Sequence, residues 1–360
     1  MRIVIKVGTQ AILAQDGTLL KSTLSVLVGQ IAALQGAGHH VALVSSGAVG
    51  SGRRVARELL GREYGNTIGE KQVLASLGQH ELMHAYASMF EPYKMAAAQL
   101  LLTRQDFQTR QHYLNIARLL REILVHKNIV PVINENDSVA IEELMFTDND
   151  ELAGLIAAQL NADKLIILTS VSGVYDGHPD HPDSRLIPVI SAAAKALPEI
   201  SNAKSAQGRG GMFSKLGTAR KMSALGITTH IAGIHEPDVI ARIAGGEQVG
   251  TTILPARKKS NLKKWIAFSE GRQSGVIHIN APLFGILKKN ERVVSILPVG
   301  IESCSGDFKK GDLIEIAAPD GRKIGIGIAR YGAEKLRECL GLKGKPEFIH
   351  YDHLHLDIGA

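Results

Sequence analysis

The sequence predicts an α/β fold in which helices cover both faces of a mainly parallel sheet, followed by a small β-rich domain. Three observations predict it. Over residues 1–235, short apolar runs alternate with patterns of helical spacing, which is typical of parallel sheets with crossover helices. After Ile253 these patterns give way to short alternating segments separated by turn signals. The length of 360 residues also exceeds the usual size of one domain.

The first part of the chain contains several runs that read as buried strands. RIVIKV, at residues 2–7, is rich in β-branched residues and is closed by Gly8. Apolar residues at helical spacing follow between residues 24 and 34, which predicts a helix. The later strands are expected at residues 40–46, 128–134, 164–169 and 228–233. Ligands of such sheets bind beyond the carboxyl ends of the strands, so polar residues that follow these runs are candidates for a site.

The last third of the chain predicts a separate β-rich domain. Residues 256–271 are basic and polar and read as a linker. Beyond Arg272 come short alternating segments, and Asp320-Gly321 between two of them indicates a hairpin. The expected domains are therefore 1–255, the linker 256–271, and 272–360.

Composition excludes several classes of protein. Apolar residues make up 45% of the chain and charged residues 21%, which is typical of globular proteins rather than disordered or fibrous ones. Cys304 and Cys339 are the two cysteines, too few for a disulfide framework. The N-terminus lacks a signal-peptide pattern, and no apolar run approaches the ~18 residues of a membrane span. We therefore expect a cytoplasmic protein that does not bind a membrane.

The positive charge is concentrated at one end. The formal net charge is +6, and residues 257–360 hold 18 basic and 12 acidic side chains, so they account for all of it. Such asymmetry can indicate nucleic-acid binding. However, this segment has few aromatic residues to stack on bases, and its basic residues are scattered outside residues 257–264. A solvated surface is favoured, and nucleic acid is not an expected partner.

Two lysines beside glycines are candidates for phosphate contacts. Lys6 lies in an otherwise apolar strand and is soon followed by Gly8, so its ammonium must reach solvent at the strand end or pair with an anion. In GRGGMFSK, at residues 208–215, Gly210 and Gly211 precede a helical pattern that has Lys215 in its first turns. Backbone amides at the start of a helix favour phosphate, and Lys215 adds a full charge.

Acidic and amide side chains gather in two further segments. INENDSVA, at residues 133–140, follows an expected strand, and FTDND, at residues 146–150, precedes a helical pattern. Asp148 or Asn149 can cap that helix. Capping accounts for one or two of these groups and not for eight. The remainder suits a site that binds an ammonium group, or Mg²⁺ through a nucleotide.

The motifs together resemble those of a known family. KVGT, VSSGAV, TIGEKQ, AQLLLTRQD, INENDSVA, DND, LTSVSGVYD and GRGGMFSKL occur in the order and spacing of the glutamate 5-kinases, a branch of the amino acid kinase family. This resemblance covers residues 1–255. SILPVGI, GDFKKGDLIEI and IGIGIARY, within residues 295–331, resemble the PUA domain that follows the kinase domain in many bacterial members. The implied fold is the amino acid kinase fold followed by a small PUA barrel.

The resemblance also implies an activity. It implies ATP-dependent phosphorylation of the side-chain carboxylate of L-glutamate to L-glutamyl 5-phosphate, the first step of proline biosynthesis. Mg²⁺ would accompany ATP, L-proline would be the feedback inhibitor, and the protein would be a homo-oligomer.

Residue roles follow from matching positions. The implied catalytic residues are Lys6 and Lys215, which hold the ATP phosphates, and Asp150, which orients both lysines. The implied glutamate-binding residues are Ser46, Asp137 and Asn149. No residue is directly assigned to a metal. The implied nucleotide contacts, besides Lys6, are Thr169, Ser170, Arg209, Gly210, Gly211, Met212, Phe213, Ser214 and Lys215.

Some positions depart from the family pattern. Thr147 stands where Gly is usual, Ser170 where Asp is common, and Gln10 where Ser is common, and NAPLF at residues 280–284 lacks the usual acidic turn. None of these removes a phosphate-binding lysine or a glutamate ligand. Two alternatives are another small-carboxylate or phosphate kinase of the same fold, and an RNA-binding protein that works through its PUA domain. An RNA-binding scaffold does not need Lys6 and Lys215 together with the acidic loops, which favours the kinase.

Overall fold

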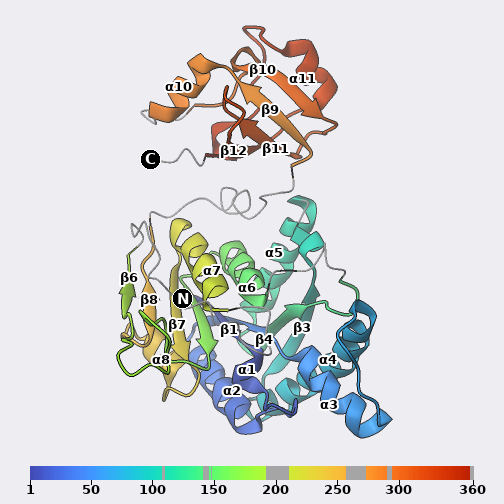
Figure 1. Cartoon of the computed structure of the whole chain (residues 1–360), viewed down its shortest axis with the longest axis vertical. Coiled ribbons are helices and arrows are strands. Elements are labelled where there is room, and N and C mark those ends of the chain that lie inside the picture. The colour runs from blue at the N-terminus through green and yellow to red at the C-terminus, as the bar shows by residue number, and fades with distance from the viewer. Residues whose placement is uncertain are drawn as a thin grey trace. The chain divides into compact units, whose positions relative to one another are not determined.

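A computed structural model describes residues 1–107, 110–140, 146, 148–191, 211–256, 273–289 and 294–356 (Figure 1). The chain divides into two compact units, Met1–Asp106 with Leu114–Lys258, and Phe107–Tyr113 with Lys259–Ala360. Thr147, Arg209, Gly210 and most of the predicted linker lie outside the described residues. The predicted domain boundaries therefore stay predictions.

The first unit is built on an eight-stranded sheet with the order β3-β4-β2-β1-β5-β7-β8-β6. Neighbouring strands are parallel except β7 and β8. The strands are β1 (Arg2–Val7), β2 (His40–Ser45), β3 (Ala96–Leu102), β4 (Ile129–Glu135), β5 (Lys164–Thr169), β6 (Val189–Ile190), β7 (Thr228–Gly233) and β8 (Thr251–Ile253). Because β1 lies between β2 and β5, the strand that carries Lys6 is central.

Helices flank this sheet (Figure 1). Helix α2 packs with α4 and α8, while α6 packs with α7. The helices are α1 (Thr9–Ile12), α2 (Lys21–Gly36), α3 (Ala48–Leu60), α4 (Ile68–Phe90), α5 (Arg110–Val125), α6 (Asn149–Leu160), α7 (Met212–Ala224) and α8 (Val239–Ala244). Buried aliphatic side chains of β1, β2, β4, α2, α4 and α8 form one apolar core. The predicted mainly parallel α/β architecture is confirmed.

The five predicted strands are present, each within one residue of its expected limits. Three strands were not predicted. Strand β3 reads AAAQLLL, whose alanines carry little strand signal. Strands β6 and β8 are only two and three residues long, too short for a periodic pattern.

Helices α3 and α4 approach each other unusually closely because of two glycines. A Cβ on Gly52 would lie 1.9 Å from the backbone oxygen of Leu74, and one on Gly78 would lie 1.8 Å from that of Ala48. No side chain fits at either position. The contact holds α4 against the start of α3.

The second unit contains a five-stranded sheet with the order β10-β9-β11-β12-β13. Its elements are β9 (Gly275–Ile279), α10 (Ala281–Lys289), β10 (Ile301–Gly306), β11 (Leu313–Ala317), β12 (Lys323–Ile328), α11 (Ala333–Cys339) and β13 (Leu354–Leu356). Strands β11 and β12 form the predicted hairpin, and Gly321 adopts a φ of 81°, which favours glycine. The described part of the alternating segment RVVSILP, residues 294–298, contains no strand, and Ile296 makes only a single bridge with Ile349.

No helix among the described residues has both the length and the apolar character needed to cross a membrane.

Candidate active site

The carboxyl ends of the central strands open into a cavity of 610 Å³. Its wall comes from the segments that follow β1, β2, β4 and β5, together with the starts of α6 and α7. Residues on this wall include Lys6, Gly8, Ser46, Asn134, Asp137, Asp148, Asn149, Thr169 and Lys215. The cavity lies where the topology of a parallel sheet places a ligand site.

Two lysines and one carboxylate form the charged centre of this site. Lys6 Nζ lies 2.8 Å from Asp150 Oδ1, and Lys215 Nζ lies 3.1 Å from Asp150 Oδ2. Asp150 is fully buried, and both lysines are less than one-tenth exposed. Two ammonium groups are thus held by one carboxylate, so these three side chains together carry a formal net charge of +1.

The environment keeps Asp150 ionised. Burial raises the pKa of this carboxyl, but the charges of Lys6 and Lys215 outweigh burial and hold the pKa below its usual value. Asp148 is the N-cap of α6, the helix that contains Asp150. Its Oδ1 accepts hydrogen bonds from the backbone N–H groups of Asp150 and Glu151, at 2.9 and 3.1 Å. Burial and the nearby charge of Asp150 raise the pKa of Asp148. The capping role considered for Asp148 is confirmed.

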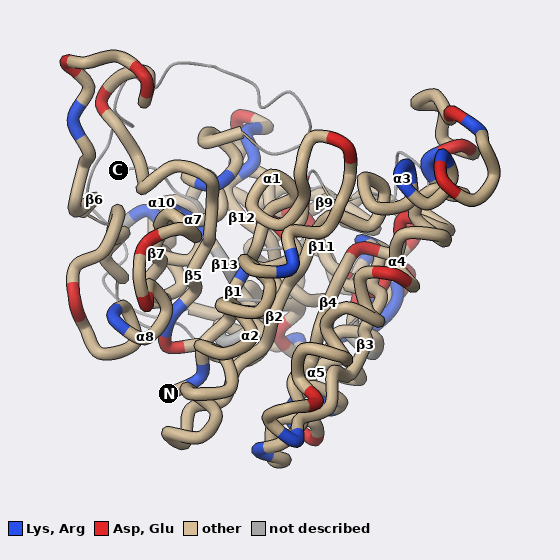
Figure 2. Tube along the Cα trace, turned by 90° about the horizontal axis from the view of Figure 1, so that it is seen from below, with Lys and Arg blue, Asp and Glu red and all other residues tan. Residues whose placement is uncertain are grey.

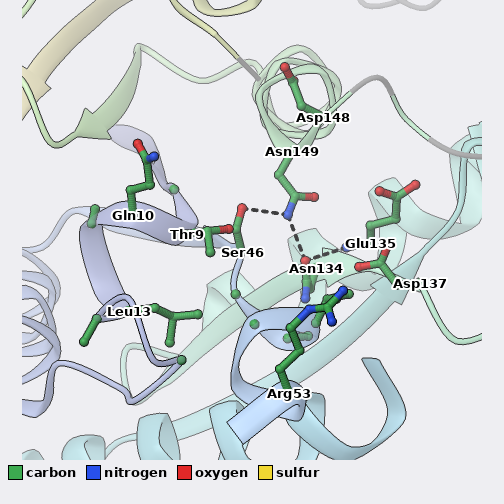
Figure 3. A pocket seen from close by; sticks show the side chains of 18 of the residues that line it. Thr9, Gln10, Leu13, Ser46, Arg53, Asn134, Glu135, Asp137, Asp148 and Asn149 are labelled. Atoms are coloured by element: carbon green, nitrogen blue, oxygen red, sulfur yellow. Dashed lines mark hydrogen bonds between the residues drawn. The ribbon is translucent and has the colours of Figure 1, made fainter. Parts of the chain in front are cut away.

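A second part of the wall is made of amides and a hydroxyl (Figure 3). Asn149 Nδ2 donates to Ser46 Oγ and to Asn134 Oδ1, each at 2.9 Å. Asn134 is the second-last residue of β4, and its Oδ1 accepts a hydrogen bond from the backbone N–H of Glu135 at 2.8 Å. Glu135 Oε1 in turn accepts the N–H of Phe146 at 2.7 Å. These bonds connect the end of β4 to the start of α6.

The outer wall includes α3, where Arg53 and Arg57 line the cavity. Arg53 donates to the carbonyl oxygen of Gly65 at 2.8 Å and to Asn66 Oδ1 at 2.6 Å. Arg57 pairs with Glu63 at 2.8 Å. Figure 2 shows basic and acidic residues interspersed near α3. This wall is therefore of mixed charge rather than a basic patch.

Most residues expected from the sequence come together here. Those on the cavity wall are Lys6, Ser46, Asp137, Asn149, Thr169, Ser170 and Lys215. Asp150 pairs with both lysines. Gly211 precedes α7 as its N-cap, but Met212, Phe213 and Ser214 are not among the residues that line the cavity, and Phe213 is exposed. Of the departures from the family pattern, Gln10 and Ser170 line the cavity.

Sequence reasoning did not assign three residues that the structure connects to the site. Asn134 and Glu135 belong to the quoted INEND motif, so their position at the end of a strand was an available signal. No such signal marks Gln79, because it lies in the middle of α4 and contacts Asn134 only in the folded protein. No group of three or more His, Cys, Asp or Glu side chains within the described residues could hold a metal ion.

Comparisons with known proteins agree with this geometry. The model of the amino acid kinase family matches residues 1–233, and that of the PUA domain matches residues 287–346. The glutamate 5-kinase of Chlorobaculum tepidum is 45% identical over 356 residues, which is 99% of this chain and 97% of that protein. The glutamate 5-kinase of Bacteroides thetaiotaomicron is 38% identical over 359 residues, 99% of this chain and 98% of that protein.

A solved structure supports the fold. The carbamate kinase of Giardia lamblia, solved with AMP-PNP bound, covers 71% of this chain and 98% of its own, with a TM-score of 0.50 and 19% identity. The parallel sheet, the cavity at its carboxyl edge and the full-length relatives lead to one conclusion: the chain belongs to the glutamate 5-kinase branch of the amino acid kinase family and carries a C-terminal PUA domain.

Proposed function

We propose that this protein transfers the γ-phosphoryl group of ATP to the side-chain carboxylate of L-glutamate, giving L-glutamyl 5-phosphate, the first step of proline biosynthesis. The observation that carries this proposal is the Lys6–Asp150–Lys215 arrangement at 2.8 and 3.1 Å, beside an amide-lined wall of the same cavity. The printed names of the full-length relatives support the choice of glutamate. Such a biosynthetic role fits the cytoplasm expected from the sequence.

The proposed reaction needs charge neutralisation rather than a base. The acceptor carboxylate is already ionised at neutral pH, so no proton has to be removed before it attacks. The two lysine ammonium groups would stabilise the negative charge on the phosphoryl oxygens as the bond between the γ-phosphoryl group and the leaving ADP breaks. Asp150 is unsuited to act as a base, because its pKa is lowered and both its oxygens face lysines. Its proposed role is to hold both ammonium groups in place.

The residues present fit a nucleotide with Mg²⁺. Gly8 places no side chain beside the Lys6 ammonium, which a Cβ would meet at 3.4 Å. Helix α7 begins after Gly211 without a side-chain cap, so its first amides suit phosphate oxygens. Asp148 Oδ2 is buried without a hydrogen-bond partner among the described residues, and such an oxygen suits Mg²⁺. When bound, Mg²⁺ would neutralise phosphate charge, and the phosphates and water would supply most of its ligands.

The acceptor can be tested directly. With ATP, Mg²⁺, L-glutamate and hydroxylamine, the purified protein is expected to yield glutamyl γ-hydroxamate, because hydroxylamine traps acyl phosphates. L-Aspartate and N-acetyl-L-glutamate serve as matched acceptors. A clear signal with either of these beside a flat result with L-glutamate would assign the protein to another carboxylate kinase of the same fold.

Two further properties are proposed with the reaction. L-Proline is proposed as the feedback inhibitor, and a homo-oligomer as the assembled form. Both follow from the family resemblance. Inhibition of hydroxamate formation by L-proline and the mass in solution would test them separately.

We further propose that the catalytic machinery is complete in residues 1–255 and that residues 272–360 have a structural or regulatory role. All described residues of the cavity wall come from the first unit. A chain that ends at Lys259 is therefore expected to keep measurable glutamate kinase activity, checked by the hydroxamate assay. Complete inactivity of this shortened chain, with a normal circular dichroism spectrum, would refute the proposal. Sequence-selective RNA binding by the full chain at physiological salt would refute the regulatory role.

A further inference from the structure

The buried amide of Gln79 lies outside the cavity but is connected to it. Gln79 belongs to α4, is 9% exposed and does not line the cavity. Its Oε1 accepts a hydrogen bond from Asn134 Nδ2 at 2.8 Å. The preceding residue is Gly78, whose missing side chain allows α4 to approach α3. Gln79 thus joins α4 to Asn134 on β4.

Gln79, Asn134 and Asn149 form a series of hydrogen-bonded side-chain amides. Backbone groups at Asn134 and at Asn149 determine how these amides are oriented. The backbone N–H of Glu135 can only donate, so the Asn134 atom 2.8 Å away is Oδ1. The Nδ2 of Asn134 then faces Gln79, which must present its acceptor Oε1. At the other end, the backbone oxygen of Ser45 can only accept, so the Asn149 atom 3.2 Å away is Nδ2. Each amide in the series therefore has one orientation that satisfies its neighbours.

This arrangement determines which atoms remain to bind a ligand. Asn149 Oδ1 is directed away from the network, and it is buried with no hydrogen-bond partner among the described residues. In Figure 3 this oxygen points away from Ser46. A buried acceptor that lacks a donor is costly unless a ligand supplies one. Ser46 Oγ accepts from Asn149 Nδ2 at 2.9 Å, which leaves its own hydrogen to donate to a carboxylate.

We propose that Gln79 is a positioning residue that holds Asn134, and through it Asn149, so that Asn149 Oδ1 accepts a hydrogen bond from the ammonium group of an amino-acid substrate. This inference rests on the proposed function for the identity of that substrate. Gln79 acts on the ligand only through Asn134, since it does not line the cavity. Loss of its acceptor would leave the Asn134 Nδ2 group unpaired and allow the Asn134 and Asn149 amides to turn.

The test compares variants with and without the acceptor. Gln79→Met and Gln79→Leu remove it, and Gln79→Glu keeps an acceptor oxygen in either protonation state. The Met and Leu variants are expected to raise KM for L-glutamate about tenfold, which is the factor for one weakened hydrogen bond to a charged group. Their KM for ATP and their kcat should stay within about threefold of the values of the original protein. Gln79→Glu should restore KM to within about threefold of the original protein. The kinetics are interpreted for whichever of the Met and Leu variants keeps the original Tm.

A control separates this effect from the general loss of a buried amide. Gln35, on α2, is 1% exposed and donates to the backbone oxygen of Ile129, at a place that does not line the cavity. Gln35→Leu is expected to lower Tm without changing KM for L-glutamate. Three results would each overturn the proposal. They are an unchanged KM for L-glutamate in the Met and Leu variants, an equal rise in KM for ATP, and a KM for L-glutamate in Gln79→Glu as high as that in Gln79→Leu.

A crystal structure of the Gln79→Leu or Gln79→Met protein provides a test that does not depend on the substrate. The expected result is a turned or disordered Asn149 amide. An Asn149 that keeps its contacts with Ser45 and Ser46 would overturn the proposal. If the original protein shows no turnover with L-glutamate, the proposed function fails, and this structure still decides the role of Gln79.

Discussion

Alanine at Lys6 or at Lys215 is expected to lower kcat by about 10²- to 10³-fold, the cost of removing one electrostatic donor from a transition state. Each ammonium group lies against Asp150 at the inner end of the cavity, where charge would develop on the transferring phosphoryl group. The remaining lysine still pairs with Asp150 in either variant, so the protein should fold and Tm should change little. Steady-state kinetics of hydroxamate formation and a thermal melt measure both quantities.

Lys164 is a matched control for these variants. It lies at the start of β5, half-buried, and its Nζ donates to the backbone oxygen of Ile243 at 2.6 Å. It does not line the cavity. Lys164→Ala is expected to keep kcat within about threefold of the original protein. Normal turnover in Lys6→Ala or Lys215→Ala would show that the phosphate assignment is wrong.

Asp150→Asn is expected to lower kcat by a similar factor, about 10²- to 10³-fold, for a different reason. An asparagine presents one acceptor and one donor, so its NH₂ group would face one of the two ammonium groups that the carboxylate now holds. Both buried lysines would also lose their counter-charge. Breaking such a buried pair costs about 3 kcal/mol or more in the free energy of unfolding. Kinetics and urea denaturation would measure the two effects.

Asp163→Asn serves as the control, because Asp163 accepts the backbone N–H of Arg2 at 2.8 Å at the opposite end of β1. The Asp163→Asn variant should leave kcat unchanged.

The pH dependence of the original protein adds a check. The folded pKa of Asp150 is lowered, so the stability from its charge is present above the ordinary value of 3.8 and is lost only as pH falls through the lower, folded value. A fall in kcat between about pH 8 and 5 therefore cannot come from Asp150, and an Asp150→Asn variant with full activity would remove its proposed role.

The sequence predicted the sheet and the charged centre better than the polar network around them. Apolar runs such as KLIILT identify buried strands because burial of both faces of a parallel sheet removes polar residues. A lysine in such a run stands out for the same reason, which is why Lys6 was found. Motif resemblance added Asp150 and Lys215.

The remaining residues could not be found in this way. Gln79 lies in a helix without any local pattern that distinguishes it from other buried polar residues, and its partner Asn134 comes 55 positions later. The contact joins α4 to β4, and such a contact is a property of the tertiary fold. The short strands β6 and β8 were missed because two or three residues cannot show a period.

The central position of β1 has a consequence for how the chain is made. Its partner β2 is synthesised early, but β5, which pairs with the other edge of β1, ends only at residue 169. Lys215 follows Lys6 by 209 residues. At about 5–20 residues per second, a ribosome needs roughly 10–40 s to pass from one lysine to the other. During much of that time one edge of β1 has no strand to pair with, and an open edge invites aggregation. A product of interrupted translation that ends before α7 would contain much of the sheet and lack Lys215.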